Sequence, residues 1–149
     1  MTEIGFYHLT QTKLAQALPR LLGRVLAQQG RAVVLCADDE RRGALDTALW
    51  VAGDPDWLPH GTKASGNAAA QPIWLTTDDA PAPNAARFLF TIDGAASTHV
   101  DAYDRVFDLF DGADEQAVAA ARERWRLAKA AGHTLTYWKQ GARGWEKAA

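Results

Sequence analysis

The chain has 149 residues, enough for one compact domain with its own hydrophobic core. A composition of 48% hydrophobic and 23% charged residues excludes a disordered or fibrous protein. A formal net charge of −2 argues against a protein that coats DNA or anionic lipid, because such binders neutralise phosphates with a large cationic surface.

The cysteine content and the hydropathy of the chain indicate where the protein works and whether it holds a cofactor. Cys36 is the one cysteine, which excludes an internal disulfide, and no Cys/His cluster has metal-ligand spacing. The N-terminus lacks the charged region and apolar stretch of a signal peptide, and no segment approaches the roughly 18 apolar residues of a membrane span. We therefore expect a cytoplasmic protein without a cofactor or a metal.

The chain opens with a predicted strand and a predicted helix. Glu3–Leu9 is short and rich in Ile, Phe and Tyr, which is typical of a strand. Leu14–Gln29 carries apolar residues at helical spacing, with Gly30 as the expected stop. Pro19 either begins this helix or kinks it.

A second strand and helix follow. Arg31–Ala37 is a continuous apolar run, typical of a strand buried on both faces of a parallel sheet. Asp38 or Asp39 can cap a helix that runs through Trp50. Gly53–Gln71 is rich in Gly, Pro, Ala and Asn, and we expect an irregular crossing segment there.

The second half continues the alternation. We expect strands at Pro72–Thr76, Arg87–Asp93 and Arg105–Phe110, with a helical stretch around Ser97–Tyr103. Asp114–Ala131 is the clearest helix, and Gly132 is its stop. His133–Lys139 closes the domain as a strand, and Gln140–Ala149 is expected as a C-terminal tail, which Trp145 can anchor. Alternating strands and helices predict a single three-layer Rossmann-like α/β domain over residues 1–139, with a mainly parallel central sheet.

This fold class raises the question of nucleotide binding. The first strand–helix turn, His8–Lys13, contains no glycine, although a phosphate cradle requires a Gly-rich turn there. The chain has no G-x-x-x-x-G-K-[ST] motif, and Gly61–Gly66 resembles a phosphate loop only superficially. Helix capping explains Asp38 and Asp39 without a ligand.

The residues also give no sign of hydrolytic chemistry. The chain has neither a G-x-S-x-G elbow nor an H-E-x-x-H motif. Its histidines are scattered and are expected to be structural or exposed: His8, His60, His99 and His133. Cys36 lies in an apolar strand, where a thiol behaves as a small hydrophobic group, and Asp78 and Asp79 are expected to form a turn.

Aromatic and basic residues are more informative. Six tryptophans are many for this length; Trp74 and Trp138 fall in strands and are expected in the core, whereas Trp50 and Trp57 either anchor a partner or pack on their own domain. In the late helix, spacings of three and four place four residues on one face: Arg122, Trp125, Arg126 and Lys129. Three cations around an aromatic ring suit an acidic peptide with an aromatic end, and an ordinary solvated face has the same pattern.

Several segments together resemble a known family over nearly the whole chain. They are Phe6-Tyr7-His8-Leu9, Leu45-Asp46-Thr47-Ala48-Leu49-Trp50, Trp57-Leu58-Pro59-His60 and Ala121-Arg122-Glu123-Arg124-Trp125-Arg126, the last followed by Ala131-Gly132. In order and spacing the chain resembles the chi subunit of bacterial DNA polymerase III holoenzyme. Each motif is modest alone, and the set at matching separation is fairly specific. The residues after Lys139 extend beyond the usual end of the family.

The resemblance implies a non-catalytic accessory protein with a Rossmann-like fold that has lost nucleotide binding. Family members link the clamp loader, through the psi subunit, to single-stranded-DNA-binding protein, whose acidic C-terminal peptide ends in Pro-Phe. Carried onto this chain, the tail-binding helix maps to Arg122, Trp125, Arg126 and Lys129, with Arg122 expected to hold the terminal carboxylate. The surface for psi or another clamp-loader or helicase partner maps to Trp50, Trp57, Pro59 and His60.

Two alternatives stay open at this point. One is a nucleotide-binding or enzymatic α/β domain with an unrecognised site. The other is direct single-strand DNA binding through the basic residues of the C-terminal third, namely Arg122, Arg124, Arg126, Lys129, Lys139 and Arg143. The acidic net charge argues against the second alternative, so no strong direct nucleic-acid binding is expected.

Overall fold

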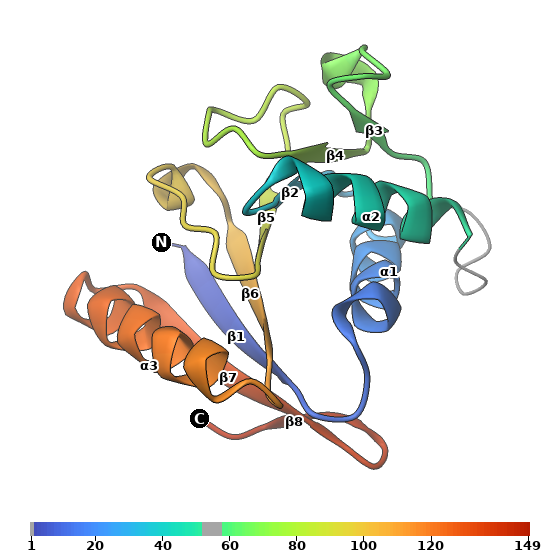
Figure 1. The fold of residues 1–149 in the computed structure, drawn as a ribbon. Helices are drawn as coiled ribbons and strands as arrows, with labels where there is room; N and C mark the ends of the chain where they lie inside the picture. The colour runs from blue at the N-terminus through green and yellow to red at the C-terminus, as the bar shows by residue number, and fades with distance from the viewer. Residues whose placement is uncertain (1, 52–57) are drawn as a thin grey trace.

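A computed structural model describes residues 2–51 and 58–149 (Figure 1). Within these ranges eight strands form one sheet, in the order β3-β4-β2-β5-β6-β1-β7-β8. The strands are β1 Glu3–Leu9, β2 Ala32–Leu35, β3 Gly61–Thr62, β4 Ile73–Thr76, β5 Phe88–Ile92, β6 Arg105–Asp111, β7 Thr134–Gly141 and β8 Gly144–Lys147. The helices are α1 Leu14–Ala27, α2 Asp39–Trp50 and α3 Glu115–Ala130, with short 3-10 turns at Ala68–Ala70 and Val100–Ala102.

Neighbouring strands are parallel throughout except for the β7–β8 pair, which is antiparallel. The predicted α/β class with a mainly parallel sheet is therefore confirmed. The narrower three-layer Rossmann-like assignment stays a prediction.

Two apolar cores lie on opposite faces of the sheet, because alternate residues of each strand point to opposite sides. On one face, Leu18 and Leu22 of α1 and Leu45 of α2 pack against strand residues such as Phe90. On the other face, Ala121 and Trp125 of α3 pack with a second set of strand residues that includes Phe6, Leu89 and Phe110. Figure 1 shows α3 separated from α1 and α2 by the strands. Surface features on α3 and on α1 therefore belong to different sides of the molecule.

The local sequence patterns predicted most of the helices and strands correctly. The first strand has the predicted bounds, and α2 ends at Trp50 as expected. Its N-cap is Asp38, whose carboxylate accepts a hydrogen bond from the Arg41 amide at 2.8 Å. Asp114 caps α3 in the same way, and Gly132 follows that helix with a φ of 88°.

The start and end of α1 differ from expectation. The helix begins at Leu14 after Lys13, so Pro19 lies inside it and does not begin it. It ends at Ala27, and the left-handed residue after its C-cap is Gln29, with a φ of 59°, rather than Gly30. Gly30 is needed for another reason: a Cβ there would lie 2.7 Å from the Phe88 ring.

The segments expected to be irregular contain short elements. The expected crossing segment includes β3 and the turn at Ala68–Ala70, and residues 53–57 of it lie outside the described residues. The helical stretch expected around Ser97–Tyr103 is the 3-10 turn Val100–Ala102.

The strand expected to stop at Lys139 continues to Gly141 and turns back as β8. The expected tail is therefore largely an edge strand in this structure. Trp145 holds β8 in this position, because its ring packs edge-to-face on Tyr7, with 5.1 Å between ring centroids, and contributes to the core on the α1 side. Gly144, at a φ of 122°, allows the turn.

Candidate functional site

The predicted basic face on α3 divides into buried and exposed parts. Trp125 is partly buried and lies over β1 and β7: its ring contacts Phe6 and Tyr137 edge-to-face, with centroid distances of 5.3 and 5.8 Å. Its position is therefore fixed by the sheet beneath it. Arg122, Arg126 and Lys129 are exposed around this ring.

The three exposed cations are not equivalent. Arg126 is bound to Glu123, one turn earlier, with contacts of 2.6 and 3.1 Å. Arg122 and Lys129 make no ion pair with any residue that the structure describes. These two cations are thus available to an incoming anion, whereas Arg126 must first leave Glu123.

Strand β7 adds residues that the helix spacing did not indicate. Tyr137 lies beneath Trp125, and its hydroxyl is 2.7 Å from His8 Nδ1. Lys139, two residues further along β7, points to the same face, and parallel pairing places it opposite His8. We define the α3–β7 face as Arg122, Trp125, Lys129, Tyr137 and Lys139. The strand alternation of residues 137 and 139 was visible in the sequence, but their position under α3 was not.

Electrostatics link the two elements of the α3–β7 face. Burial lowers the pKa of His8, and the nearby charges of Lys139 and Arg122 lower it further. Burial raises the pKa of Tyr137, and Arg122 opposes that rise. The Arg122 charge on α3 therefore lowers the pKa of two side chains on the strands, His8 on β1 and Tyr137 on β7.

Arg124 does not belong to this face. Its guanidinium forms a two-contact ion pair with the buried Asp108 carboxylate, at 2.7 and 2.9 Å. Burial raises the pKa of Asp108, and the Arg124 charge acts against that rise. One of the six cations in the direct DNA-binding alternative is thus turned toward the sheet.

The aromatic surface lies elsewhere. Trp50, at the end of α2, is 59% exposed, and the adjacent Val51 is 76% exposed. The Trp50 ring rests on His60, with 4.4 Å between ring centroids. The His60 side chain is fully enclosed, with Nε2 2.9 Å from Asp46 and Nδ1 2.6 Å from the Leu58 carbonyl.

Of the residues expected on this surface, Trp50 is exposed, and the buried His60 lies under its ring. Pro59 is partly exposed. Trp57 lies outside the described residues. Trp74 is buried as predicted, whereas Trp138 is only partly buried against the core.

The turn after β1 bears on the nucleotide-binding alternative. The backbone amides of Thr10, Gln11 and Thr12 all donate to Gln140 Oε1, at 3.0, 2.9 and 3.1 Å. Consecutive amides at the start of a helix are the groups that bind phosphate in nucleotide-binding folds. The adjoining cavity of about 840 Å³ is lined by charges of both signs, Asp93 and Asp111 together with Lys13 and Arg41, and is therefore not a cationic site for a phosphate.

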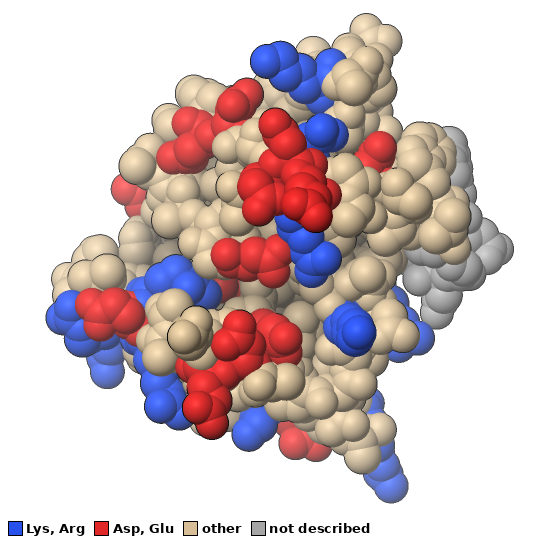
Figure 2. All heavy atoms as spheres, in the orientation of Figure 1, with Lys and Arg blue, Asp and Glu red and all other residues tan. Residues whose placement is uncertain are grey.

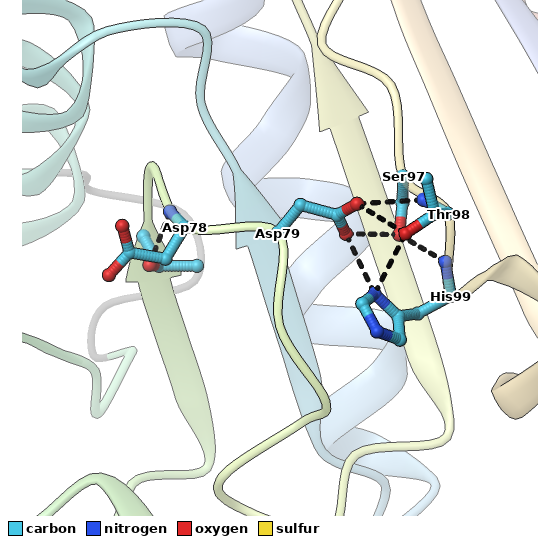
Figure 3. Close-up of polar contacts among 6 residues, drawn as sticks. Asp78, Asp79, Ser97, Thr98 and His99 are labelled. Atoms are coloured by element: carbon cyan, nitrogen blue, oxygen red, sulfur yellow. Dashed lines mark hydrogen bonds and ion pairs between the residues drawn. The ribbon is translucent and has the colours of Figure 1, made fainter.

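A serine, a histidine and an aspartate meet between two loops, as Figure 3 shows. Ser97 Oγ donates to Asp79 at 2.6 Å, His99 Nδ1 lies 3.1 Å from the same carboxylate oxygen, and Thr98 donates to the other oxygen through its amide and hydroxyl. These contacts lower the pKa of Asp79. In a catalytic triad the histidine bridges serine and carboxylate; here both bind the carboxylate, so the cluster fastens one loop to the other.

Other reactive groups are inert or scattered. Burial raises the pKa of the Cys36 thiol to about 12, which keeps it protonated. Within residues 2–51 and 58–149, no three His, Cys, Asp or Glu side chains are grouped so that they could hold a metal ion. Over the same residues, no helix has the length and apolar character to cross a membrane.

Comparison with known proteins gives two matches. A family model described as "DNA polymerase III chi subunit, HolC" matches residues 1–136. A curated protein named "Probable DNA polymerase III subunit chi", from Rickettsia prowazekii (strain Madrid E), is 30% identical over 110 residues, which are 72% of this chain. The match covers 66% of that relative, just under two thirds of its length.

Proposed function

The chain belongs to the DNA polymerase III chi subunit family, a family of replication accessory subunits, and from this premise we propose that it links the clamp loader to single-stranded-DNA-binding protein. In this proposal the protein has no catalytic activity of its own and works in the cytoplasm at the replisome. The proposal includes a three-layer Rossmann-like arrangement, in which the helices on the two faces of the sheet hold two protein-binding surfaces apart.

The α3–β7 face is the proposed binding site for the acidic C-terminal peptide of single-stranded-DNA-binding protein. The observation that carries this assignment is that Arg122 and Lys129, exposed on the helix face of Trp125, form no ion pair with any described residue. Arg122 suits the terminal carboxylate, because a guanidinium can bind it with two parallel hydrogen bonds. Lys129 and Lys139 attract the upstream aspartates, an effect that mainly raises the association rate.

Trp125 offers the peptide a rigid wall. Its ring is already held by Phe6 and Tyr137, so little conformational entropy is lost when a phenylalanine ring packs beside it. A peptide held by one anchor and a few charges is expected to bind at roughly micromolar strength, or about −8 kcal/mol.

Titration calorimetry with an acidic peptide ending in Pro-Phe tests this site. We expect Arg122→Ala to weaken binding about tenfold or more, because truncating a desolvated Arg–carboxylate contact costs about 2–5 kcal/mol. Arg126→Ala on the same helix is the comparison variant: Arg126 is paired with Glu123 in the free protein, so its effect should be smaller than that of Arg122→Ala. Equal affinities for wild type and Arg122→Ala would rule out this site.

Truncation of Trp125 needs a separate control because its ring is part of the core on the α3 side. Trp125→Leu keeps apolar contact with Phe6 and removes the aromatic wall. We expect this variant to bind the peptide more weakly while thermal unfolding stays cooperative. A variant that binds normally would restrict the site to the cations alone.

The surface around Trp50 is the proposed contact for the psi subunit or another clamp-loader or helicase partner, with Trp57, Pro59 and His60 assigned by family resemblance. Trp50 supports this because a large exposed aromatic ring that rests on the buried His60, itself bonded to the partly exposed Asp46, is a preformed anchor. Pull-down with Trp50→Ala should lose the second partner and keep single-stranded-DNA-binding protein. Arg122→Ala should show the reverse pattern, so the two surfaces are tested independently.

A further inference from the structure

A groove between α1 and the β7–β8 hairpin lies on the opposite side of the sheet from α3. It consists of two adjoining cavities of about 430 and 250 Å³, which share Leu21, Arg24 and Trp145 in their walls. The groove follows α1 from Gln16 to Gln28, which is roughly 18 Å of helix. It is long enough for a ligand with several repeating units.

Four arginines line this groove, and they come from three parts of the chain. Arg20 and Arg24 are one turn apart on α1, Arg143 lies in the hairpin turn, and Arg105 begins β6. None of the four forms an ion pair with a described residue, and neither cavity has an Asp or Glu in its wall. The groove is therefore a local cationic site on an acidic protein.

Aromatic rings stand beside these cations. Trp145 packs edge-to-face on Tyr7, and Trp138 is stacked on the same ring with 6.3 Å between centroids. The Arg105 guanidinium lies 4.7 Å from the centroid of Phe107 and donates to the Tyr7 hydroxyl at 3.3 Å. Both tryptophans are partly exposed, and their positions are fixed by core contacts.

We propose that this groove binds single-stranded nucleic acid, with the arginines on phosphates and the tryptophans under bases. Proteins that bind single strands without sequence preference combine a cationic groove with aromatic faces for stacking. Each cavity is lined by arginine guanidiniums and by at least one tryptophan. This combination suits a nucleic acid strand, in which every nucleotide carries a phosphate and a base. The cavity walls consist mainly of side chains that project from α1 and the hairpin, whereas an extended peptide usually docks on a strand edge by main-chain hydrogen bonds.

The acidic net charge limits the strength of this binding and does not prevent it. Figure 2 shows acidic side chains gathered over the amino ends of α2 and α3, with basic ones along α3 and at the end of the β7–β8 hairpin. On the face seen in Figure 2, most acidic side chains therefore lie away from the hairpin turn. Binding should be modest and strongly salt-dependent, because each phosphate contact in a single strand contributes about −0.7 to the slope of log K against log salt.

This site goes beyond the proposed peptide binding and does not depend on it. The groove lies on the α1 face and the peptide site on the α3 face, so a nucleic acid and an acidic peptide can be bound together. Each surface also supplies a matched control for the other, since each has exposed, unpaired cations.

Fluorescence anisotropy with a labelled oligothymidylate, measured at several salt concentrations, tests the proposal on the whole protein. Arg20→Ala/Arg24→Ala should weaken binding about tenfold or more and make the salt slope shallower by about 1.4, whereas Arg122→Ala/Lys129→Ala should bind like wild type. Trp145→Leu, with thermal unfolding measured in parallel, should lose about fivefold or more. The proposal is overturned if the α3 variant loses oligonucleotide binding and the groove variant keeps it, or if an acidic peptide binds in the groove and the oligonucleotide does not.

Discussion

Gln140 holds Thr12 with both ends of its carboxamide: Oε1 accepts from the Thr12 amide at 3.1 Å, and Nε2 donates to Thr12 Oγ1 at 2.7 Å. The same Oε1 accepts from two preceding amides. A side chain from the end of β7 thus occupies the turn where a phosphate binds in related α/β folds. This contact explains how a fold of this class can stabilise its first turn without glycine and without a nucleotide.

Loss of the Gln140 carboxamide should destabilise the protein. Gln140→Ala leaves three amides without their partner, and we expect a loss of about 1–3 kcal/mol in the free energy of unfolding, measured by urea denaturation. Gln140→Glu keeps an acceptor oxygen and should retain most of the stability. Gln116→Ala, at an exposed site on α3, is the control and should change little. A loss in Gln140→Ala no larger than in that control would contradict this role.

The buried ion pair on α3 should matter far more than the exposed one. Arg124→Ala leaves the buried Asp108 carboxylate unpaired, so we expect a loss of about 3–5 kcal/mol. Arg126→Ala removes an exposed pair with Glu123 and should change the free energy of unfolding far less, because solvent screens exposed pairs. Similar losses in the free energy of unfolding for the two variants would show that burial does not determine how much each ion pair contributes to stability.

The pH dependence of Arg124→Ala gives a second check on the same pair. Burial raises the pKa of Asp108, and removing Arg124 removes the charge that opposes the rise. A carboxyl group with a raised pKa in the folded state binds protons more readily than in the unfolded state, so stability is lost as pH rises. The deficit of the variant should therefore shrink as pH falls toward the unfolded value of about 4. Asp108→Asn in the same background should remove this pH dependence.

Asp79 should stabilise the protein in a way that acid removes. Its folded pKa is lowered by contacts with Ser97, Thr98 and His99, so its contribution is complete above the unfolded pKa of about 4 and declines as pH falls further. We expect Asp79→Ala to cost about 1–2 kcal/mol at neutral pH, with the gap to wild type narrowing in acid. The neighbouring Asp78, whose carboxylate points away from this cluster in Figure 3, provides the control Asp78→Ala. A gap that is constant from neutral pH into acid would contradict the assignment.

The parts of the fold that sequence predicted are those set by local chemistry. Asp38 and Asp114 cap the helices that follow them. The continuous apolar run around Val34 predicted a strand buried on both faces, and β2 is such a strand. The departures arise from contacts between distant residues. Tyr7 and Trp145 are far apart in sequence, and no local pattern indicates that Tyr7 offers the ring on which β8 docks.

The candidate site shows the same division. Helix periodicity placed Arg122 and Trp125 on neighbouring positions, and the spacing of Glu123 and Arg126 is that of an i,i+3 ion pair, which the structure contains. What periodicity could not show is that Trp125 lies over Tyr137, because the pairing of β1 with β7 decides which strand runs under α3. That tertiary contact turns a basic helix face into a surface shared with β7.

His8 provides a probe of that shared surface. The pKa of His8 is lowered by burial, then by Lys139 and Arg122, so Lys139→Ala and Arg122→Ala should each raise it, and Arg126→Ala should leave it unchanged.

An acidic peptide bound on the α3–β7 face adds negative charge near the imidazole and should raise the same pKa. By linkage, a ligand that raises a pKa binds more tightly to the protonated form. Because the His8 pKa of the free protein is lowered, peptide affinity should increase as pH falls through the unperturbed histidine value of about 6.5 and continue to increase below it. Proton NMR titration of His8 with and without the peptide measures the shift, and calorimetry across this pH range measures the linked affinity. An unchanged His8 pKa at saturating peptide would place the peptide away from β7, even where Arg122→Ala weakens its binding.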